Sequence, residues 1–477
     1  EGPMGSIEVA GLDGGSITVR AAQLDRLASA VGGRLLAAGD AGWADAVRIW
    51  NGMVAQAPAL VAQPASAAEV AAAVRFATDH GLLLSVKGGG HNIAGTSIAA
   101  GGLTLDMSRL RQVEVDPAAR LARAGAGCLL QDVDRATQEH GLATALGFVS
   151  ETGVAGLTLG GGFGYLSRRF GYAADNLAAA EVVTADGEVR TASADHEPEL
   201  FWALRGGGAN LGVVTRFTFQ LHEVGPTITG GLIAWPGERT GEVLATYRAL
   251  TESAPRHLTA ALTVRLAPAA PFIPAEWHGR PIVGMVLCHS GADPEGDLAP
   301  VRAVGRPIAD LVMEKPYAAQ QSMLDATQPK GMHYYWKTEF LPGLPDGFLE
   351  RFRAAALAVT SPMSQSFLFH IGGALNERPA DDGAVGNRDA EFVGGFAGSW
   401  PPDDPEPGAH LAWVRGSWEG IRPFSTGGNY VNFQLADDDD ARTAAAYGAN
   451  LGRLRQVKAA YDPANLFRVN RNVSPAQ

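Results

Sequence analysis

Glycine-rich turns are the part of this sequence best suited to chemistry. The chain has 60 glycines, and they gather at residues 88–90, 153–164, 206–212 and 427–428. Successive backbone N–H groups in such a turn form a concave anion site, because glycine lets the backbone close around a phosphate. His91 directly follows the first turn. Two phosphate-cradle candidates indicate an extended dinucleotide ligand facing His91; plain tight turns and a structural histidine are the alternatives.

Motifs of several other nucleotide and hydrolase sites are missing from the sequence. The strand–GxGxxG–helix fingerprint of Rossmann folds is not met, because residues 88–93 read GGGHNI and no helix plainly follows. Neither a GxxxxGK[ST] phosphate loop nor a GxSxG nucleophile elbow occurs. The sequence therefore argues against a Rossmann-type nicotinamide dehydrogenase and against a serine hydrolase of the GxSxG type.

Composition narrows the class of protein further. The 477 residues are 46% hydrophobic and carry a net charge of −12, which fits a globular protein and disfavours nucleic acid as a partner. Cys128 and Cys288 are too few for a disulfide framework or a zinc cluster, and we expect no metal. No apolar run is long enough to span a bilayer, so no membrane partner is expected. We expect a cytoplasmic protein; residues 1–6 (EGPMGS) resemble an expression scar, which leaves an original leader open.

Periodicity and capping signals place the elements that position the glycine turns. Ser66 and Glu69 form a capping box for a helix that ends near His80, where Gly81 stops it. A short apolar strand at 82–86 runs into the first turn. Patterns further along predict strands at 103–106, 112–116, 121–127 and 213–221, a hairpin over 181–191, and helices at 130–140 and 200–204. The second glycine stretch, 153–164, has neither a helical nor a strand period.

The pattern of expected strands and helices changes at about residue 225. Strand-like runs at 230–235, 258–266, 281–290 and 366–374 alternate with helix-like runs at 237–253, 297–305 and 348–359. This pattern is typical of an α+β lobe built on a largely antiparallel sheet covered by helices. Glycines return after residue 424, followed by a helix over about 441–461. We predict an α+β fold in three segments: 7–224, 225–423, and 424–477, the last returning to the first lobe.

Seven motifs along the chain are similar, in the same order, to those of one enzyme family. They read SVKGGGHNIAG (85–95), GVAGLTLGGGFG (153–164), DNL (175–177), LRGGGANLGVVT (204–215), YWK (335–337), STGGNYVNF (425–433) and YDPANLF (461–467). Each motif alone is weak, but together they cover nearly the whole chain. The sequence resembles the berberine bridge enzyme-like oxidoreductases, which belong to the vanillyl-alcohol oxidase, or PCMH-type, flavoprotein family.

The resemblance implies a non-Rossmann FAD-binding lobe formed by both chain ends, with a substrate lobe inserted between them. This division matches the changes in the pattern of expected elements near residues 225 and 424. By the matching loop, His91 is the ring joined covalently to the flavin 8α-methyl carbon. The residues implied to bind FAD are Lys87, Gly88, Gly89, Gly90, His91, Asn92, Gly95, Thr152, Gly153, Gly156, Leu157, Gly160, Gly161, Gly162, Gly164, Gly212, Val214, Tyr430, Asn432 and Asn472.

Only one covalent link to the flavin is expected. Many relatives add a second link through a cysteine, but this chain has Val149 at that position and no cysteine near it. Some relatives carry a histidine where this chain has Leu157. Cys128 lies upstream at the end of a predicted strand, where we expect it to pack as a small apolar residue.

Two side chains are candidates for the catalytic base. Glu377 follows the strand that supplies the base in berberine bridge enzyme itself, and partial desolvation there would raise its pKa; the alternative is a solvated carboxylate in a turn. Tyr430 is the second candidate, because relatives acting on alcohols use a tyrosine near the flavin. The spacing of Tyr430 and Asn432 would place both on one strand face, with packing against the flavin as the alternative role. The residues expected to line the substrate pocket are Tyr335, Lys337 and His370.

The resemblance implies an FAD-dependent oxidase that acts on an alcohol, sugar or amine carbon. Hydride would pass to flavin N5, and O2 would be reduced to H2O2. A dehydrogenase with another electron acceptor is one alternative, because the small residues at 152–155 do not decide oxygen access. A non-catalytic flavin-bearing binding or resistance protein is another, which the retained Tyr430 and Glu377 argue against. The expected partners are a small-molecule substrate and O2, for a monomer or weak homo-oligomer.

Overall fold

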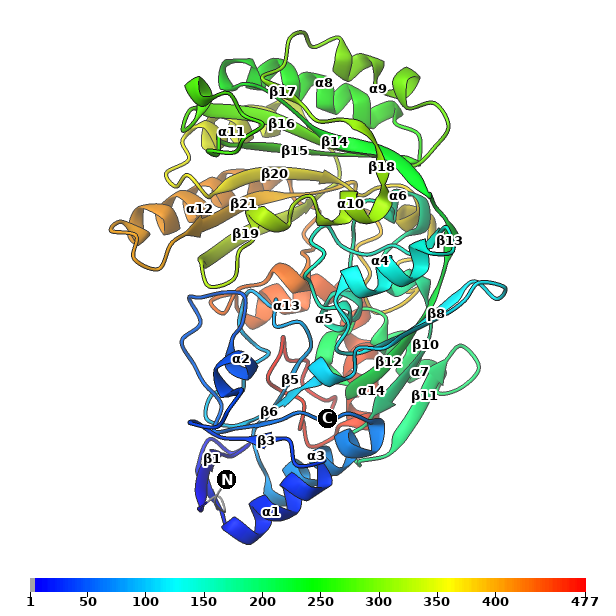
Figure 1. Cartoon of the computed structure of the whole chain (residues 1–477), viewed down its shortest axis with the longest axis vertical. Helices are drawn as coiled ribbons and strands as arrows, with labels where there is room; N and C mark the ends of the chain where they lie inside the picture. The colour runs from blue at the N-terminus through cyan, green and yellow to red at the C-terminus, as the bar shows by residue number, and fades with distance from the viewer. Residues whose placement is uncertain (1–4) are drawn as a thin grey trace.

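The computed structural model describes residues 5–477, and residues 1–4, part of the expected expression scar, lie outside the described residues. Figure 1 shows two halves stacked along the long axis. One half holds an eight-stranded sheet with helices on its outer side, and the other half holds both chain ends. The prediction of an α+β fold in which the two ends share one lobe is confirmed.

The sheet nearest the N-terminus leads the chain into the first glycine turn. Its four strands are ordered β3–β4–β6–β5, with β4, β6 and β5 parallel. Helix α3 connects β4 to β5, and the Ser66 hydroxyl caps it by accepting the Glu69 N–H at 3.2 Å. Around these lie β1 (Ile7–Ala10), β2 (Ser16–Val19), α1 (Ala21–Ala30), β3 (Leu35–Leu36), α2 (Trp43–Val47), β4 (Leu60–Ala62), α3 (Ala67–His80), β5 (Leu84–Lys87) and β6 (Leu103–Asp106).

A five-stranded antiparallel sheet, ordered β11–β10–β12–β8–β7, completes this half. The predicted hairpin is confirmed, since β10 pairs with β11. The elements are β7 (Val113–Asp116), β8 (Leu121–Gly125), α4 (Leu130–Gln138), β9 (Leu142–Ala143), α6 (Ser167–Phe170), β10 (Leu177–Val183), β11 (Val189–Ser193), α7 (Pro198–Leu204), β12 (Val213–Gln220) and β13 (His222–Glu223).

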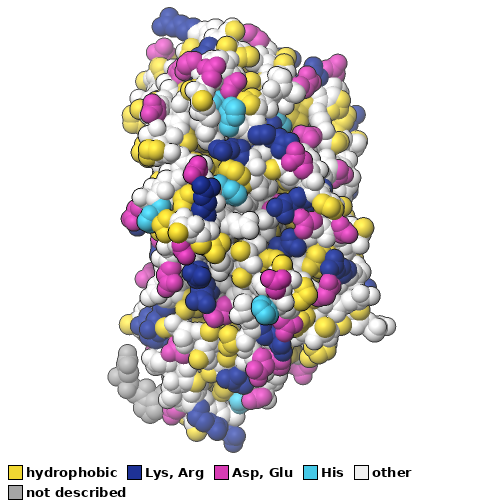
Figure 2. Space-filling model, turned by 90° about the vertical axis from the view of Figure 1, so that its right-hand side faces the viewer, with side chains coloured by type: hydrophobic (Ala, Val, Ile, Leu, Met, Phe, Trp, Pro, Cys, Tyr) yellow, Lys and Arg dark blue, Asp and Glu magenta, His cyan; other side chains and the backbone are white. Residues whose placement is uncertain are grey.

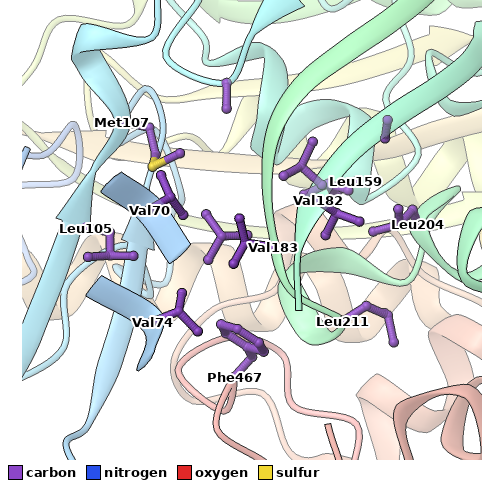
Figure 3. Close-up of a cluster of buried hydrophobic side chains, with 14 of the residues drawn as sticks. Val70, Val74, Leu105, Met107, Leu159, Val182, Val183, Leu204, Leu211 and Phe467 are labelled. Carbon is purple, nitrogen blue, oxygen red and sulfur yellow. The ribbon is translucent and has the colours of Figure 1, made fainter. Parts of the chain in front are cut away.

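One apolar core joins the two chain ends. Val70 and Val74 of α3, Leu105 of β6 and Val183 of β10 belong to the same buried cluster as Phe467 (Figure 3). Burying such side chains contributes roughly 1.5–3 kcal/mol each. The C-terminal segment is therefore packed into the N-terminal lobe rather than appended to it.

The eight-stranded sheet is antiparallel, in the order β17–β14–β16–β15–β20–β21–β19, with β18 also paired to β14. Helices α8, α9, α11 and α12 lie on its outer side, and α10 lies between the sheet and α4 (Figure 1). The elements are β14 (Thr227–Pro236), α8 (Thr240–Ser253), β15 (Leu258–Leu266), β16 (Pro281–His289), α9 (Pro294–Arg302), β17 (Ala309–Asp310), β18 (Met313–Pro316), α10 (Tyr317–Ser322), β19 (His333–Leu341), α11 (Asp346–Leu357), β20 (Gln365–His370), β21 (Phe392–Trp400) and α12 (Pro407–Ile421).

Three local expectations were wrong. The second glycine stretch contains a short helix, α5 (Val154–Leu159), which its lack of period concealed. Tyr430 is not on a strand, because Val431–Phe433 forms a single 3-10 turn directly after it. The predicted C-terminal helix is two helices, α13 (Asp440–Tyr447) and α14 (Leu451–Tyr461), broken at Gly448, whose φ is 52°.

Candidate functional site

A cavity of about 440 Å³ connects the glycine turns with the inner face of the eight-stranded sheet. It therefore brings together segments from both halves of the molecule. Many of the residues predicted from sequence line it: Gly88, Gly89, Gly90, His91, Asn92, Thr152, Gly153, Gly156, Leu157, Tyr430 and Asn432.

The first two glycine turns meet backbone against backbone. A Cβ at Gly89 would lie 2.5 Å from the Gly153 nitrogen and 2.7 Å from its Cα, so no side chain fits there. Gly90 has a φ of 67°, a left-handed conformation that favours glycine. Hydrogen bonds from Leu130 N to Thr152 O (2.9 Å) and from Val154 N to Cys128 O (3.0 Å) hold the second turn in place. The local sequence thus builds a rigid double turn on one side of the cavity.

Polar groups along the cavity lack partners within the described chain. The backbone N–H groups of Gly89, Gly90, His91 and Asn92 have no acceptor among the described residues. All four residues line the cavity, so these N–H groups are available to donate to a polar ligand bound there. Buried side-chain atoms of cavity residues share this property: Ser97 Oγ, Trp336 Nε1, Tyr447 Oη, Asn470 Oδ1 and Arg471 Nε. FAD is an elongated anionic molecule that both accepts and donates hydrogen bonds, and it fits this set of donors and acceptors.

The C-terminal motif positions the far end of the cavity. The Asp462 carboxylate accepts the backbone N–H groups of Leu466 (2.8 Å) and Phe467 (2.9 Å), and the Lys458 ammonium donates to it at 2.8 Å. Asp462 and Lys458 are fully buried. This ion pair fixes the loop that brings Phe467, Asn470 and Arg471 to the cavity wall.

His91 is held in a stack of aromatic rings. Its ring lies 4.3 Å from that of Trp50 at 14°, and Trp50 in turn stacks on Tyr334 at 3.8 Å. Burial, and to a lesser extent the charge of Lys330, lowers the pKa of His91 to about 4. The imidazole is therefore neutral at physiological pH, keeps a nucleophilic ring nitrogen, and presents a fixed edge to the cavity.

Tyr430 is anchored by the amide of Asn432. The Asn432 Nδ2 donates to Tyr430 Oη at 2.8 Å and to Leu157 O at 3.2 Å. A Cβ at Gly160 would overlap the Asn432 side chain, so glycine is needed there for Asn432 and not for a ligand. Burial raises the pKa of Tyr430 well above its ordinary value, and it stays protonated near neutral pH.

The opposite wall is the inner face of the sheet, which the sequence analysis did not identify. Trp336 of β19, Phe367 and Phe369 of β20, and Thr263 and Arg265 of β15 line the cavity. In register, Phe367 pairs with Thr263, and Phe369 with Ala261, so these side chains share one face. Trp336 is the middle residue of the YWK motif. The alternation of side chains along a strand is the sequence signal that it faces away from Tyr335 and Lys337.

The three predicted substrate residues do not line the cavity, and that prediction was wrong. Tyr335 and Lys337 flank Trp336, so alternation directs them to the other face of β19. There Tyr335 Oη donates to Asp437 at 2.6 Å, and Lys337 Nζ to Asp438 at 2.8 Å. His370 follows Phe369 and stacks on Phe392 at 5.0 Å, with its Nε2 3.6 Å from Glu391.

Glu377 is not a desolvated carboxylate beside the cavity, so its expected environment was wrong. Its side chain is 66% exposed and pairs with Arg256 at 2.7 Å. The hydrogen bond and charge of Arg256 lower the pKa of Glu377, opposite to the shift that a general base needs. The alternative of a solvated carboxylate in a turn is the one that the structure matches.

Several predicted FAD-binding residues lie behind the cavity wall instead of on it. Lys87 donates its ammonium to Ala46 O at 2.7 Å, and Gly95 packs against Val54. The others that do not line the cavity are Gly160, Gly161, Gly162, Gly164, Gly212, Val214 and Asn472. Most of these glycines allow close approach between segments of the chain. Cys128 is buried as expected, which raises the pKa of its thiol to about 12.

Among residues 5–477, one group of side chains outside the cavity could hold a metal ion: His257, His289 and Asp297. Asp297 Oδ2 lies 2.7 Å from His289 Nε2 and 3.1 Å from His257 Nε2. The Gly291 N–H donates to His289 Nδ1 at 3.2 Å, so the proton of His289 sits on Nε2 and points at Asp297. The geometry therefore favours a hydrogen-bonded triad over a metal centre.

Neither a one-sided charge pattern on the face seen in Figure 2 nor a membrane-spanning helix within residues 5–477 is found. Basic and acidic side chains are interspersed on the face seen in Figure 2. Within residues 5–477, no helix combines the length and the apolar character needed to cross a membrane.

Comparisons with known proteins agree with the cavity. A family model for FAD-binding domains matches residues 58–193, and one described as berberine and berberine-like matches 429–474. An FAD-linked oxidoreductase of Dictyostelium discoideum is 30% identical over 435 residues, covering 90% of this chain and 91% of the relative. The (R)-6-hydroxynicotine oxidase of Paenarthrobacter nicotinovorans is 30% identical over 475 residues, covering 93% and 97%.

A solved structure shares the fold over nearly its whole length. The glucooligosaccharide oxidase of Acremonium strictum, described with a 6-S-cysteinyl, 8α-N1-histidyl FAD, superposes with a TM-score of 0.83 at 23% identity. The match covers 95% of this chain and 99% of that one. With its double glycine turn, its FAD-binding segment and its full-length relatives, the chain belongs to the berberine bridge enzyme-like family of FAD-linked oxidoreductases.

Proposed function

We propose that this enzyme is an oxidase with one FAD covalently bound through His91. FAD supplies the hydride acceptor at N5 for oxidation of an alcohol, sugar or amine carbon, and O2 serves as final acceptor and yields H2O2. The observation that carries the proposal is the single cavity in which His91, the unpaired N–H groups of residues 89–92 and an aromatic sheet face meet.

Backbone and side-chain groups on the cavity wall would bind different parts of FAD. The N–H groups of Gly89 to Asn92 and the guanidinium of Arg471 would bind the diphosphate and its neighbouring sugar groups. We propose segments 7–224 and 424–477 as the FAD-binding domain and 225–423 as the substrate domain. This division assigns the glycine turns to one domain and the aromatic sheet face to the other.

The covalent link is supported by the state of His91. A neutral imidazole, fixed by Trp50, keeps a ring nitrogen free to bond carbon. A histidyl link is described for the glucooligosaccharide oxidase. Val149 stands at the position of the second, cysteinyl link in many relatives, and it lines the cavity here, so we propose a single link.

Tyr430 is the proposed partner of the reacting substrate atom. No Asp, Glu or Lys of the described chain lines the cavity, and two tyrosines, Tyr430 and Tyr447, do. Tyr430 packs against Phe163 and Phe433 beside the aromatic wall, so we assign the acid–base role to its hydroxyl. Since it is protonated, it first donates a hydrogen bond to the substrate heteroatom. Phe163, with its ring centroid 4.8 Å from that of Tyr430, helps to exclude water from this position.

Anaerobic photoreduction followed by admission of air tests the oxidase proposal. Recovery of the oxidised flavin spectrum within seconds, with H2O2 formed, supports it. A reduced spectrum that persists for many minutes would replace it with a dehydrogenase. Screening alcohols, sugars and amines for anaerobic flavin bleaching then identifies substrates, and bleaching by none of them would favour a flavin-bearing binding protein.

A further inference from the structure

An unpaired arginine stands on the cavity-facing side of β15. Arg265 lines the cavity, and its Nε and Nη2 donate only to backbone oxygens, of Leu266 (3.0 Å) and Pro362 (3.3 Å). No carboxylate among the described residues forms a salt bridge with it. Arg265 is partly buried, and desolvation lowers its pKa.

Two polar side chains accompany Arg265 at this end of the sheet face. Thr263 stands two residues before it on the same face, and its hydroxyl donates to Gln365 Oε1 at 3.0 Å. Gln365 lies on the adjacent strand, directly across from Arg265 by the register of Val264 with Ser366. The Gln365 amide N–H groups therefore remain free beside the guanidinium.

The rest of the face is apolar and aromatic. Neighbouring positions in register are occupied by Ala261, Val286, Phe367, Phe369 and Ala397, all lining the cavity. Trp336 is separated from Arg265 by three strand spacings, or about 14 Å between Cα atoms. The row between them crosses Gln365 and Ala397, and Phe367 flanks it with its ring centroid 6.1 Å from that of Trp336. A substrate bound to Arg265 can therefore place a ring system against Phe367 and Trp336, on the side of the cavity that also holds Tyr430.

We propose that the cavity selects a substrate with a largely apolar ring system and a carboxylate, with the carboxylate bound by Arg265 and Gln365. The carbon oxidised is then at the end of the molecule remote from the carboxylate, beside Tyr430. This inference rests on the proposed function and narrows it, since an oligosaccharide would leave its hydroxyls unpaired on the phenylalanine-lined face.

Binding of matched probes to the purified holoenzyme tests the proposal. Naphthoate and naphthamide share one ring system and differ in charge, and a disaccharide serves as the sugar probe. Affinity is read from quenching of tryptophan fluorescence, because Trp50 and Trp336 line the cavity, and from perturbation of the flavin spectrum. We expect naphthoate to bind about 10- to 100-fold more tightly than naphthamide, as for a hydrogen bond to a charged group, and the disaccharide to bind weakest.

Variants assign the preference to one side chain. Arg265→Gln is expected to remove the advantage of naphthoate while leaving naphthamide unchanged, and Arg265→Lys to retain part of it. Gln365→Glu places a carboxylate beside Arg265 and is expected to abolish the advantage by itself, which covers the case in which Arg265→Gln does not fold. The matched control is Arg256→Gln, because Arg256 is 46% exposed and pairs with Glu377 outside the cavity.

Equal affinity for naphthoate and naphthamide, no binding of either, or a preference that survives both Arg265→Gln and Gln365→Glu would overturn the proposal. Two measurements on the same preparation distinguish this proposal from the proposed function: acid precipitation, which shows whether the flavin stays with the protein, and re-oxidation of the reduced flavin by air. A protein that prefers naphthoate but whose reduced flavin does not react with air contradicts the proposed oxidase function. A protein whose reduced flavin reacts with air but that does not prefer naphthoate contradicts the carboxylate site at Arg265.

Discussion

Replacing Gly89 by alanine probes the contact on which the cofactor site is built. The new methyl carbon would lie 2.5 Å from Gly153 N, 2.7 Å from Gly153 Cα and 3.3 Å from Leu129 Cδ2. Ordinary contacts between carbon atoms need about 3.5–4.0 Å, so the two turns must separate by roughly 1 Å. The same contact excludes a side chain at Gly153. The φ of −71° and ψ of 134° at Gly153 suit any residue, so only the lack of space next to Gly89 requires glycine there.

Two consequences of different size are expected. Overpacking costs about 1–3 kcal/mol, which for a chain of this length lowers the melting temperature by only a few degrees. The flavin content should fall much further, because a shift of roughly 1 Å misaligns the N–H groups of residues 89–92, and each hydrogen bond to a charged group is worth about 1.5–3 kcal/mol. The assay is the ratio of flavin to protein absorbance in the purified variant, alongside thermal unfolding.

Two other glycines separate packing from cofactor contact. A Cβ at Gly156 or Gly452 has no neighbour within 4 Å, and both lie in helices, α5 and α14. Alanine there gains about 0.5–1 kcal/mol of helix stability. Only Gly156 lines the cavity, so Gly156→Ala should lose flavin without losing stability, and Gly452→Ala should lose neither. Full flavin content in either of the two variants at cavity-lining glycines, Gly89→Ala or Gly156→Ala, would refute the placement of FAD against these turns.

Three further predictions concern single side chains. Tyr430→Phe should keep its flavin but lower turnover by about 10²- to 10⁴-fold with any substrate identified, and wild-type rates should show no rise from tyrosinate below about pH 10; a near-wild-type rate would contradict its role. Glu377→Gln should leave both the melting temperature and the turnover close to wild type, because its ion pair is exposed; a large loss of rate would restore Glu377 as a base. Burial raises the pKa of Asp134 from its ordinary 3.8 to about 7, so its contribution to stability is present below pH 3.8 and lost as the pH rises through about 7. The free energy of unfolding of Asp134→Asn should therefore exceed that of wild type at pH 8, by up to about 4 kcal/mol, and by less at pH 5. An equal difference at both pH values would count against this titration.

Local chemistry made the cofactor side of the cavity predictable. The turn before His91 follows from a short segment whose geometry glycine largely dictates, and Tyr430 and Asn432 line the cavity together, on the same side as their spacing predicts. Even there, Asn432 reaches Tyr430 through a 3-10 turn and not along a strand.

The substrate wall was less predictable, because both faces of the eight-stranded sheet are covered. In β19 nearly every residue is buried, so polarity does not reveal which face points to the cavity. Lys337 is buried as deeply as its neighbours because Asp437 and Asp438, from a distant segment, pair with it. A shift of one residue exchanges the faces, so the YWK motif alone does not distinguish Trp336 from Tyr335 and Lys337 as the side chains that face the cavity.

Acid precipitation followed by peptide mass analysis shows whether FAD is bound covalently through His91. We expect the yellow colour to stay with the protein pellet, one peptide, containing His91, to carry the mass of the flavin, and His91→Ala to yield a pellet without colour. A colourless wild-type pellet beneath a yellow supernatant, or flavin on a peptide that lacks His91, would contradict covalent attachment through His91.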